Sequence, residues 1–162
     1  MNQKTEIISL LENNAKLTAQ DIAVRLNADP TEVANEIAEL EKQKIILGYR
    51  SIINWDLAEK DSVTGMIEIK ITPQRGQGFD RVANRIYSFP QVKDCFLMSG
   101  GFDLMIIIEG KTLKDVAMFV SEKIAPLESV VSTSTHFILK KYKMQGTIFE
   151  TPQIEDREAV VL

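Results

Sequence analysis

Residues 18–40 read TAQDIAVRLNADPTEVANEIAEL, and this stretch predicts two helices separated by a short turn. Thr18 opens a capping box with Asp21, a pattern that begins helices. Asp29 can cap the second helix, with Pro30 at its first position, where a missing N–H costs nothing. Because only 3 residues separate the two helices, they must meet at a sharp angle, which is typical of a helix-turn-helix.

Apolar spacing extends this pattern on both sides. Residues 7–11 form an apolar stripe at helical spacing, and Asn13-Asn14 ends it, which predicts a preceding helix. Residues 45–53 are rich in isoleucine around Gly48-Tyr49, which indicates a wing or a strand that leaves the module. We therefore expect a winged helix-turn-helix domain over residues 1–50 and a polar linker over residues 51–61.

Beyond the linker the apolar residues change from a helical to an alternating period. Ile67, Ile69 and Ile71 alternate with charged residues, which indicates a half-buried strand. Gly100-Gly101 stands between two apolar runs and predicts a two-residue hairpin turn. The expected elements are, in order, a strand around 67–71, a helix over 79–86, strands over 92–99 and 102–109, a helix over 112–124 that begins with a capping box, and a strand over 130–141.

The order β-α-β-β-α-β predicts a ferredoxin-like domain over residues 62–145, so that the whole chain has an α+β fold. Such a domain has one antiparallel sheet with both helices on one face. The chain has no segment left to cover the other face, which implies a partner, most simply a second copy. Residues 146–162 form a C-terminal extension that either folds over a partner subunit or stays mobile.

Three stretches are the most specific in the sequence: Asp29-Pro30-Thr31, residues 40–49 (LEKQKIILGY) and residues 99–103 (SGGFD). Together with the order of elements, they resemble the Lrp/AsnC (feast/famine) transcriptional regulators over residues 4–143. The resemblance implies an N-terminal domain that binds double-stranded DNA and a C-terminal RAM-type domain that forms homodimers. It further implies that dimers assemble, often to octamers, with a small amino acid or related metabolite bound between them as the effector.

The charge of the chain weighs against a nucleic-acid partner. Lys and Arg number 19 and Asp and Glu 23, and residues 1–50 are themselves acidic, with 6 basic and 8 acidic side chains. The helix that would enter the major groove carries four glutamates where the family usually carries arginines, whereas phosphate contacts favour basic surfaces. We expect weak non-specific binding that depends on multivalent assembly. The alternative is an amino-acid-sensing co-regulator with weak or no DNA binding of its own.

A helical wheel separates the two sides of this helix. Val33, Ile37 and Leu40 define the buried side, and the opposite stripe is small, polar or basic. Asparagine can recognise adenine, threonine can contact a phosphate or a thymine methyl group, and lysine can contact a phosphate. A glutamate either accepts a hydrogen bond from the cytosine amine or repels phosphates. The alternative to DNA contact is that these are ordinary solvated residues of the helix surface, and for Thr18 and Gln20 that they serve to cap their helix. The DNA-contact candidates are Thr18, Gln20, Thr31, Asn35, Glu39 and Lys42.

The candidate effector residues form two groups, Gly100, Gly101, Phe102 and Asp103 in the hairpin and Thr133, Ser134 and Thr135 in the last strand. Paired glycines permit positive φ, and a carboxylate can bind an α-ammonium group. The resemblance places both groups near the effector pocket. Gly101 stands where the family commonly has an acidic residue, which leaves the effector open. On the residues alone, the alternative for the hairpin is that Asp103 bonds its own turn. The alternative for the last strand is that its hydroxyl residues reflect only β propensity.

Several classes of protein are excluded or disfavoured by composition. The single Cys95 excludes an internal disulfide and a multi-cysteine metal site. A small enzyme on a ferredoxin-like fold remains as a rival, but no catalytic constellation or phosphate loop supports it, so we expect no catalytic residue, metal or cofactor. No apolar run approaches the length of a bilayer span, and the N-terminus lacks the features of a signal peptide. We therefore expect a cytoplasmic protein with no membrane partner.

Overall fold

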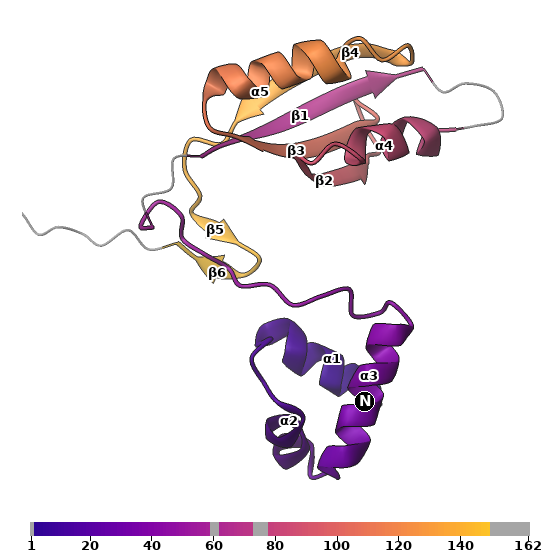
Figure 1. Ribbon diagram of the computed structural model, residues 1–162, viewed down its shortest axis with the longest axis vertical. Helices are drawn as coiled ribbons and strands as arrows, with labels where there is room; N and C mark the ends of the chain where they lie inside the picture. The colour runs from indigo at the N-terminus through magenta and orange to yellow at the C-terminus, as the bar shows by residue number, and fades with distance from the viewer. Residues whose placement is uncertain (1, 59–61, 73–77, 150–162) are drawn as a thin grey trace, which may run out of the picture. The chain divides into compact units, whose positions relative to one another are not determined.

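A computed structural model describes residues 2–58, 62–72 and 78–149 of the chain (Figure 1). It divides into two compact units, Met1–Ile53 and Asn54–Leu162. Each unit has its own buried core.

The N-terminal unit consists of three helices, α1 (Gln3–Asn13), α2 (Ala19–Leu26) and α3 (Pro30–Lys42). The Thr18 hydroxyl accepts from the Asp21 N–H, and the Asp21 carboxylate accepts from the Thr18 N–H, so the predicted capping box is confirmed. The Asp29 carboxylate caps α3 by accepting from the N–H groups of Thr31 and Glu32. Asn27 has a φ of 51°, and this left-handed residue reverses the chain between α2 and α3.

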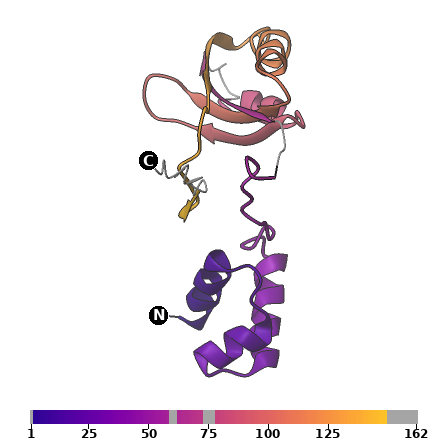
Figure 2. The ribbon, with the colours of Figure 1, turned by 90° about the vertical axis from the view of Figure 1, so that its left-hand side faces the viewer.

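These local features confirm the helix-turn-helix. In both views α2 meets the beginning of α3 at a steep angle (Figures 1 and 2). All three helices contribute to one core, whose buried members are Ile7, Leu11, Ile22, Ala23, Val33 and Leu40. Val33 and Leu40 are completely buried and Ile37 packs beside them, so the predicted inner side of α3 is correct.

The wing or strand predicted for residues 45–53 is not formed. No residue between the end of α3 and Val63 belongs to a strand in the described part of the chain. A segment with high β propensity forms a strand only when a neighbouring strand can hydrogen-bond to it. The described part of the unit that contains this segment has no strand. Residues 45–53 therefore continue from α3 as irregular chain.

The C-terminal unit is built on a four-stranded antiparallel sheet in the order β2-β3-β1-β4. The elements are β1 (Val63–Ile71), α4 (Asp80–Tyr87), β2 (Val92–Leu97), β3 (Leu104–Gly110), α5 (Leu113–Phe119), the π-helical turn η1 (Val120–Ile124) and β4 (Val130–Phe137). This order confirms the predicted ferredoxin-like arrangement. Thr112 and Asp115 form the predicted capping box at the start of α5.

The core of this unit lies between the sheet and its helices. Alternate residues of β1 and β3 are buried against α4, α5 and η1, as Ile67 and Ile106 illustrate. Gly65 lets α5 approach β1 closely, since a Cβ built there would lie 2.8 Å from Cγ1 of Val116 in α5. No helix of the described residues lies on the opposite side of the sheet, which agrees with the uncovered face expected from the sequence (Figure 1).

Several boundaries of the strands differ from the prediction. The link between β2 and β3 is longer than two residues: β2 ends at Leu97, β3 begins at Leu104, and the Met98 N–H donates to the Asp103 carbonyl at the base of the loop. β4 ends at Phe137 rather than at residue 141.

A short hairpin that the sequence did not predict follows, β5 (Lys143–Met144) and β6 (Thr147–Ile148). Gln145 and Gly146 both have positive φ at its turn, as tight hairpins require. Residues 150–162 of the predicted C-terminal extension lie outside the described part. Within that part, none of the helices has the length and apolar character to cross a membrane.

Candidate DNA interface and effector loop

The outer stripe of α3 is the candidate DNA interface. Thr31, Asn35 and Lys42 are exposed, and Ala34 and Ala38 between them are exposed as well. The stripe exists because the helical period turns these positions away from Val33 and Leu40, which are held in the core. The structure therefore brings three of the six DNA-contact candidates onto one solvent-facing side of one helix.

Glu39 stands at the margin of this stripe and already has two partners. Its Oε1 accepts from Nε2 of Gln43 at 2.8 Å, and its Oε2 lies 3.6 Å from Nζ of Lys42. The Lys42 side chain is 80% exposed, and an exposed ion pair of this kind is worth little. A phosphate can therefore compete for the Lys42 ammonium group, while Glu39 is partly neutralised by its neighbours.

The other three glutamates of the helix point away from the stripe. Glu32 and Glu36 line a flanking hollow together with residues 2–4 at the start of the chain. Glu41 accepts a hydrogen bond of 2.8 Å from the Tyr49 hydroxyl, and partial burial together with this carboxylate raises the pKa of Tyr49. No local pattern predicts the Tyr49–Glu41 contact, because irregular chain joins the two residues.

The beginning of α2 holds the remaining two candidates, and they differ. The Thr18 hydroxyl donates to Oδ2 of Asp21 at 2.6 Å and accepts from its N–H, so helix capping uses this side chain fully. These hydrogen bonds from Thr18 hold the pKa of Asp21 below its usual range. Gln20 is exposed and is not part of the capping box. Gln20 is therefore better placed than Thr18 to reach a ligand through its side chain.

Residues 100–103, the effector loop, lie between β2 and β3. Oδ2 of Asp103 accepts from the Ile71 N–H at 2.8 Å, and the Asp103 N–H donates to the Ile69 carbonyl at 3.0 Å. The side chain of Asp103 thus binds the end of β1, while its carbonyl accepts from the Met98 N–H across its own turn. Gly100 has a φ of +143°, whereas Gly101 has an ordinary φ, and a Cβ added to either would meet nothing within 4 Å.

The three candidates on β4 are divided between the two faces of the sheet. Thr133 and Thr135 pair with Ile69 and Ile67, so they share the helix-covered face. Ser134 pairs with Glu68 on the other face, as the predicted alternation requires. The structure therefore does not bring Ser134 together with the two threonines within one protomer.

The uncovered side of the sheet is called the open sheet face. Its apolar members are Met66, Phe96, Met105 and Ile107, and its polar members include Glu68, Ser134 and His136. Nε2 of His136 lies 3.3 Å from Oε1 of Glu68 and 3.3 Å from the Ser134 hydroxyl oxygen. Phe96 is 47% exposed, so part of its aromatic ring meets water on a sheet face that no described helix covers.

A helix-turn-helix with one polar, solvent-facing helix, joined to a ferredoxin-like unit with a free sheet face, defines a class of protein. It is a DNA-binding regulator with a separate domain for sensing and assembly. The chain belongs to the Lrp/AsnC family of transcriptional regulators. The ligand-binding domain of this family matches residues 64–148, which make up just over half of this chain.

Individual relatives agree with this assignment. The HTH-type transcriptional regulator YugG of Bacillus subtilis is 46% identical over 160 residues, which cover 98% of this chain and 96% of the relative. The leucine-responsive regulatory protein of Haemophilus influenzae is 23% identical over 85% of this chain and 82% of its own. The fold is shared with a transcriptional regulator of Neisseria meningitidis solved as a complex with L-Met, at a TM-score of 0.70 and 18% identity over 93% of this chain and 96% of that chain.

Proposed function

We propose that the protein is a cytoplasmic transcriptional regulator whose dimers present two copies of α3 to a pseudo-palindromic DNA site. The exposed stripe of α3 carries this proposal, because it is the side of the helix that faces away from the core and carries Thr31, Asn35 and Lys42 without a glutamate at its centre. Asn35 would read a base edge, and Thr31 and Lys42 would contact phosphates or a thymine methyl group. Gln20 and the start of α2 would lie against the DNA backbone.

The dimer would form through the open sheet face. Burying Phe96 and Ile107 against a second copy removes apolar surface from water, and a two-fold axis lets one patch serve both partners. The dimers would assemble further, to an octamer in the fullest form. Assembly multiplies the number of helices on one DNA molecule, which compensates for the acidic character of α3.

The effector would be a small amino acid or related metabolite that binds between dimers at the effector loop. Both glycines face open space within the protomer, which leaves room for a ligand or a neighbouring subunit. The Asp103 carboxylate uses Oδ2 for the Ile71 N–H, and Oδ1 is not part of that bond, so it is available for an α-ammonium group. Thr133 and Thr135 would contribute from the neighbouring dimer. The Neisseria relative that was solved with L-Met supports this class of ligand.

DNA binding tests the first part of the proposal. We expect specific binding to a site selected from random duplexes, with an affinity that falls steeply as salt rises. The four glutamates of α3 favour the alternative, a co-regulator that senses an amino acid but binds DNA weakly or not at all. Absence of binding even at low salt would decide for the co-regulator.

Light scattering with each of the standard amino acids tests the second part. An effector that binds between dimers must change the distribution of assembly states, because it has different affinities for them. We expect at least one amino acid to shift this distribution in the full-length protein. If an amino acid bound with no change in assembly or DNA affinity, the proposed link between sensing and assembly would be wrong.

A further inference from the structure

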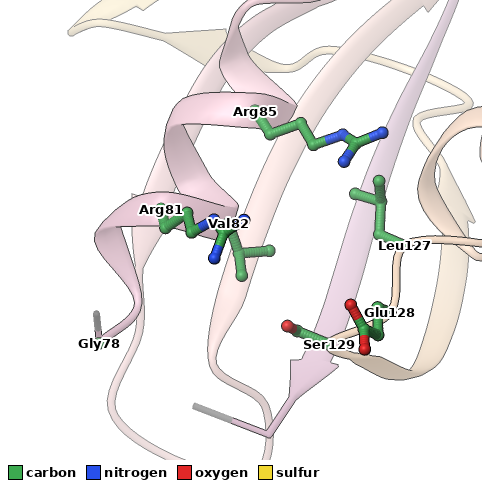
Figure 3. A pocket seen from close by; sticks show the side chains of 7 residues that line it. All are labelled: Gly78, Arg81, Val82, Arg85, Leu127, Glu128 and Ser129. Atoms are coloured by element: carbon green, nitrogen blue, oxygen red, sulfur yellow. The ribbon is translucent and has the colours of Figure 1, made fainter. Parts of the chain in front are cut away.

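A hollow in the C-terminal unit lies between α4 and the segment that connects η1 to β4. Its lining is contributed by Gly78, Arg81, Val82, Arg85, Leu127, Glu128 and Ser129. Figure 3 shows the two arginines on successive turns of α4 and the carboxylate and hydroxyl of the connecting segment across the gap from them. We call this site the α4 hollow, and none of its lining residues belongs to the effector loop or to the candidates on β4.

The α4 hollow contains both basic and acidic side chains, and Arg85 forms no ion pair with a described residue. Arg85 has no carboxylate within 4.0 Å among the described residues, although Arg81 has an interaction of its own. A guanidinium group binds a carboxylate through two parallel hydrogen bonds, which makes arginine selective for that group. The side chain of Arg85 is therefore available to hold an external carboxylate.

The opposite wall is fixed in place by its backbone. The Leu127 N–H donates to the Ile124 carbonyl at 3.1 Å, and the Ser129 carbonyl accepts from the Thr72 N–H at 2.9 Å. The Val130 N–H donates to the Leu127 carbonyl at 2.8 Å. Because these bonds hold the segment at both ends, the backbone of Glu128 and Ser129 is set without a ligand, which lowers the entropy lost on ordering this wall.

The floor of the α4 hollow is apolar. Val82 and Leu127 are partly buried and pack against the core of the unit, and Figure 3 shows both side chains between the charged groups. A ligand in the hollow would therefore place its charged groups against Arg85 and Glu128 and an apolar side chain against Val82 and Leu127. This combination is typical of sites for small metabolites.

We propose that the α4 hollow binds a free α-amino acid, at a site separate from the effector loop. Arg85 holds the carboxylate, Glu128 the α-ammonium group and Ser129 a further polar atom, while Val82 and Leu127 contact the side chain. Arg85 and Glu128 supply one charge of each sign, which matches the two charges of a zwitterion. The Glu128 carboxylate disfavours a multiply charged phosphate.

Calorimetric titration of the full-length protein with each of the 20 standard L-amino acids tests the proposal. We expect at least one of them to bind once per protomer at a site where Arg85→Gln weakens affinity about tenfold or more, as loss of a charged hydrogen bond does. Lys114→Gln is the matched control, because it removes the same charge from an exposed position outside the hollow. If no amino acid shows a dependence on Arg85 beyond that on Lys114, the proposal is refuted.

The ammonium partner is tested with a pair of ligands. We expect Glu128→Gln to weaken the amino acid about tenfold while leaving its deaminated carboxylic acid within about twofold, because only the former carries the ammonium group. An equal loss for both ligands would contradict the assignment of Glu128.

Asp103→Asn separates this site from the effector loop. Binding at the α4 hollow should survive Asp103→Asn, and binding at the effector loop should survive Arg85→Gln. If both variants abolish the same binding event, only one site exists and the α4 hollow is not an independent one. If only Arg85→Gln has an effect, the hollow stands and the proposed effector loop fails.

Discussion

The carboxylate of Asp103 and the backbone N–H of Ile71 are joined by a hydrogen bond of 2.8 Å between Oδ2 and nitrogen. The bond attaches the β2–β3 loop to the end of β1, where the pairing with β4 shifts register between Lys70 and Ile71. A residue that the sequence singles out for ligand binding therefore also supports the sheet. Any variant of Asp103 tests both roles at once, and the choice of substitution must separate them.

Asp103→Ala should lower the free energy of unfolding by about 1.5–3 kcal/mol, because it leaves a partly buried N–H without its charged acceptor. Asp103→Asn retains an acceptor oxygen and should cost less than about 1.5 kcal/mol, but it removes the charge that binds an α-ammonium group. Chemical denaturation gives the stabilities, and a thermal-shift assay with the amino acid found by light scattering gives the response. An Asn variant with a normal ligand response would remove Asp103 from the effector site.

The cap of α3 makes the N-terminal unit sensitive to acid. The N–H groups of Glu32 and Thr31 hold the pKa of Asp29 below its ordinary value. The folded-state pKa lies below the unfolded one, so the stabilisation is complete above the unfolded pKa of about 3.9 and is lost as pH falls through the folded value. We expect helical circular dichroism to decrease below about pH 4.

Asp29→Asn should remove part of this acid sensitivity, since asparagine caps a helix about as well but does not titrate in this range. Asp56→Asn, in the linker, is the control and should leave the acid transition unchanged. Identical acid transitions in wild type and Asp29→Asn would show that the cap does not govern it. Asp21, whose pKa is lowered by Thr18, contributes in the same direction and accounts for any sensitivity that remains.

Local patterns predict the helices and strands of this chain well, because caps and apolar periods are encoded over a few residues. The capping boxes at Thr18 and Thr112 and the turn between α2 and α3 are examples. The strand expected at residues 45–53 fails because propensity alone cannot provide a neighbouring strand. The two-residue hairpin fails because the backbone of Asp103 is held by Ile69 of β1, a contact that no local pattern contains.

The candidate sites also differ in whether local sequence patterns predict them. The outer stripe of α3 follows from the helical period alone, whereas the effector residues depend on the family resemblance. The α4 hollow was not predicted, since its two walls are far apart in the sequence and only folding brings them together. Its one local signal is the spacing of Arg81 and Arg85, which places both on one side of a helix.

Lys42 provides the clearest test of the DNA interface. If its ammonium group contacts a phosphate, Lys42→Gln should weaken binding to all sequences and reduce the slope of log affinity against log salt by about one per contact. Lys16→Gln, an exposed lysine in the connection between α1 and α2, is the matched control. Equal slopes for wild type and Lys42→Gln in a fluorescence-anisotropy titration would exclude the contact.

Glu39→Gln tests the same interface by removing a negative charge instead of a positive one. The Glu39 carboxylate lies 3.6 Å from the Lys42 ammonium group and faces the margin of the stripe. Removing its charge frees Lys42 and reduces repulsion of the phosphates, so non-specific affinity should rise. If Glu39 instead accepts from a cytosine amine, specific affinity should fall while non-specific affinity rises. Unchanged affinity in both measurements would place Glu39 outside the interface.

The open sheet face gives a prediction about assembly that does not depend on DNA. Ile107 pairs with Met66 on one side and Asp94 on the other, so it lies at the centre of that face. Ile107→Glu would place two carboxylates near a two-fold axis and desolvate them, which disfavours the dimer strongly. Light scattering should show monomers at concentrations where the wild type is dimeric.

The fold of each protomer should survive this substitution, since Ile107 is not among the buried residues of the core cluster. Circular dichroism checks this point. Leu113→Glu is the matched control, because Leu113 is 54% exposed on α5 and therefore lies on the helical side of the sheet. That variant should remain dimeric. If Ile107→Glu stays dimeric as well, the subunits associate through another surface, and the exposed ring of Phe96 needs a different partner.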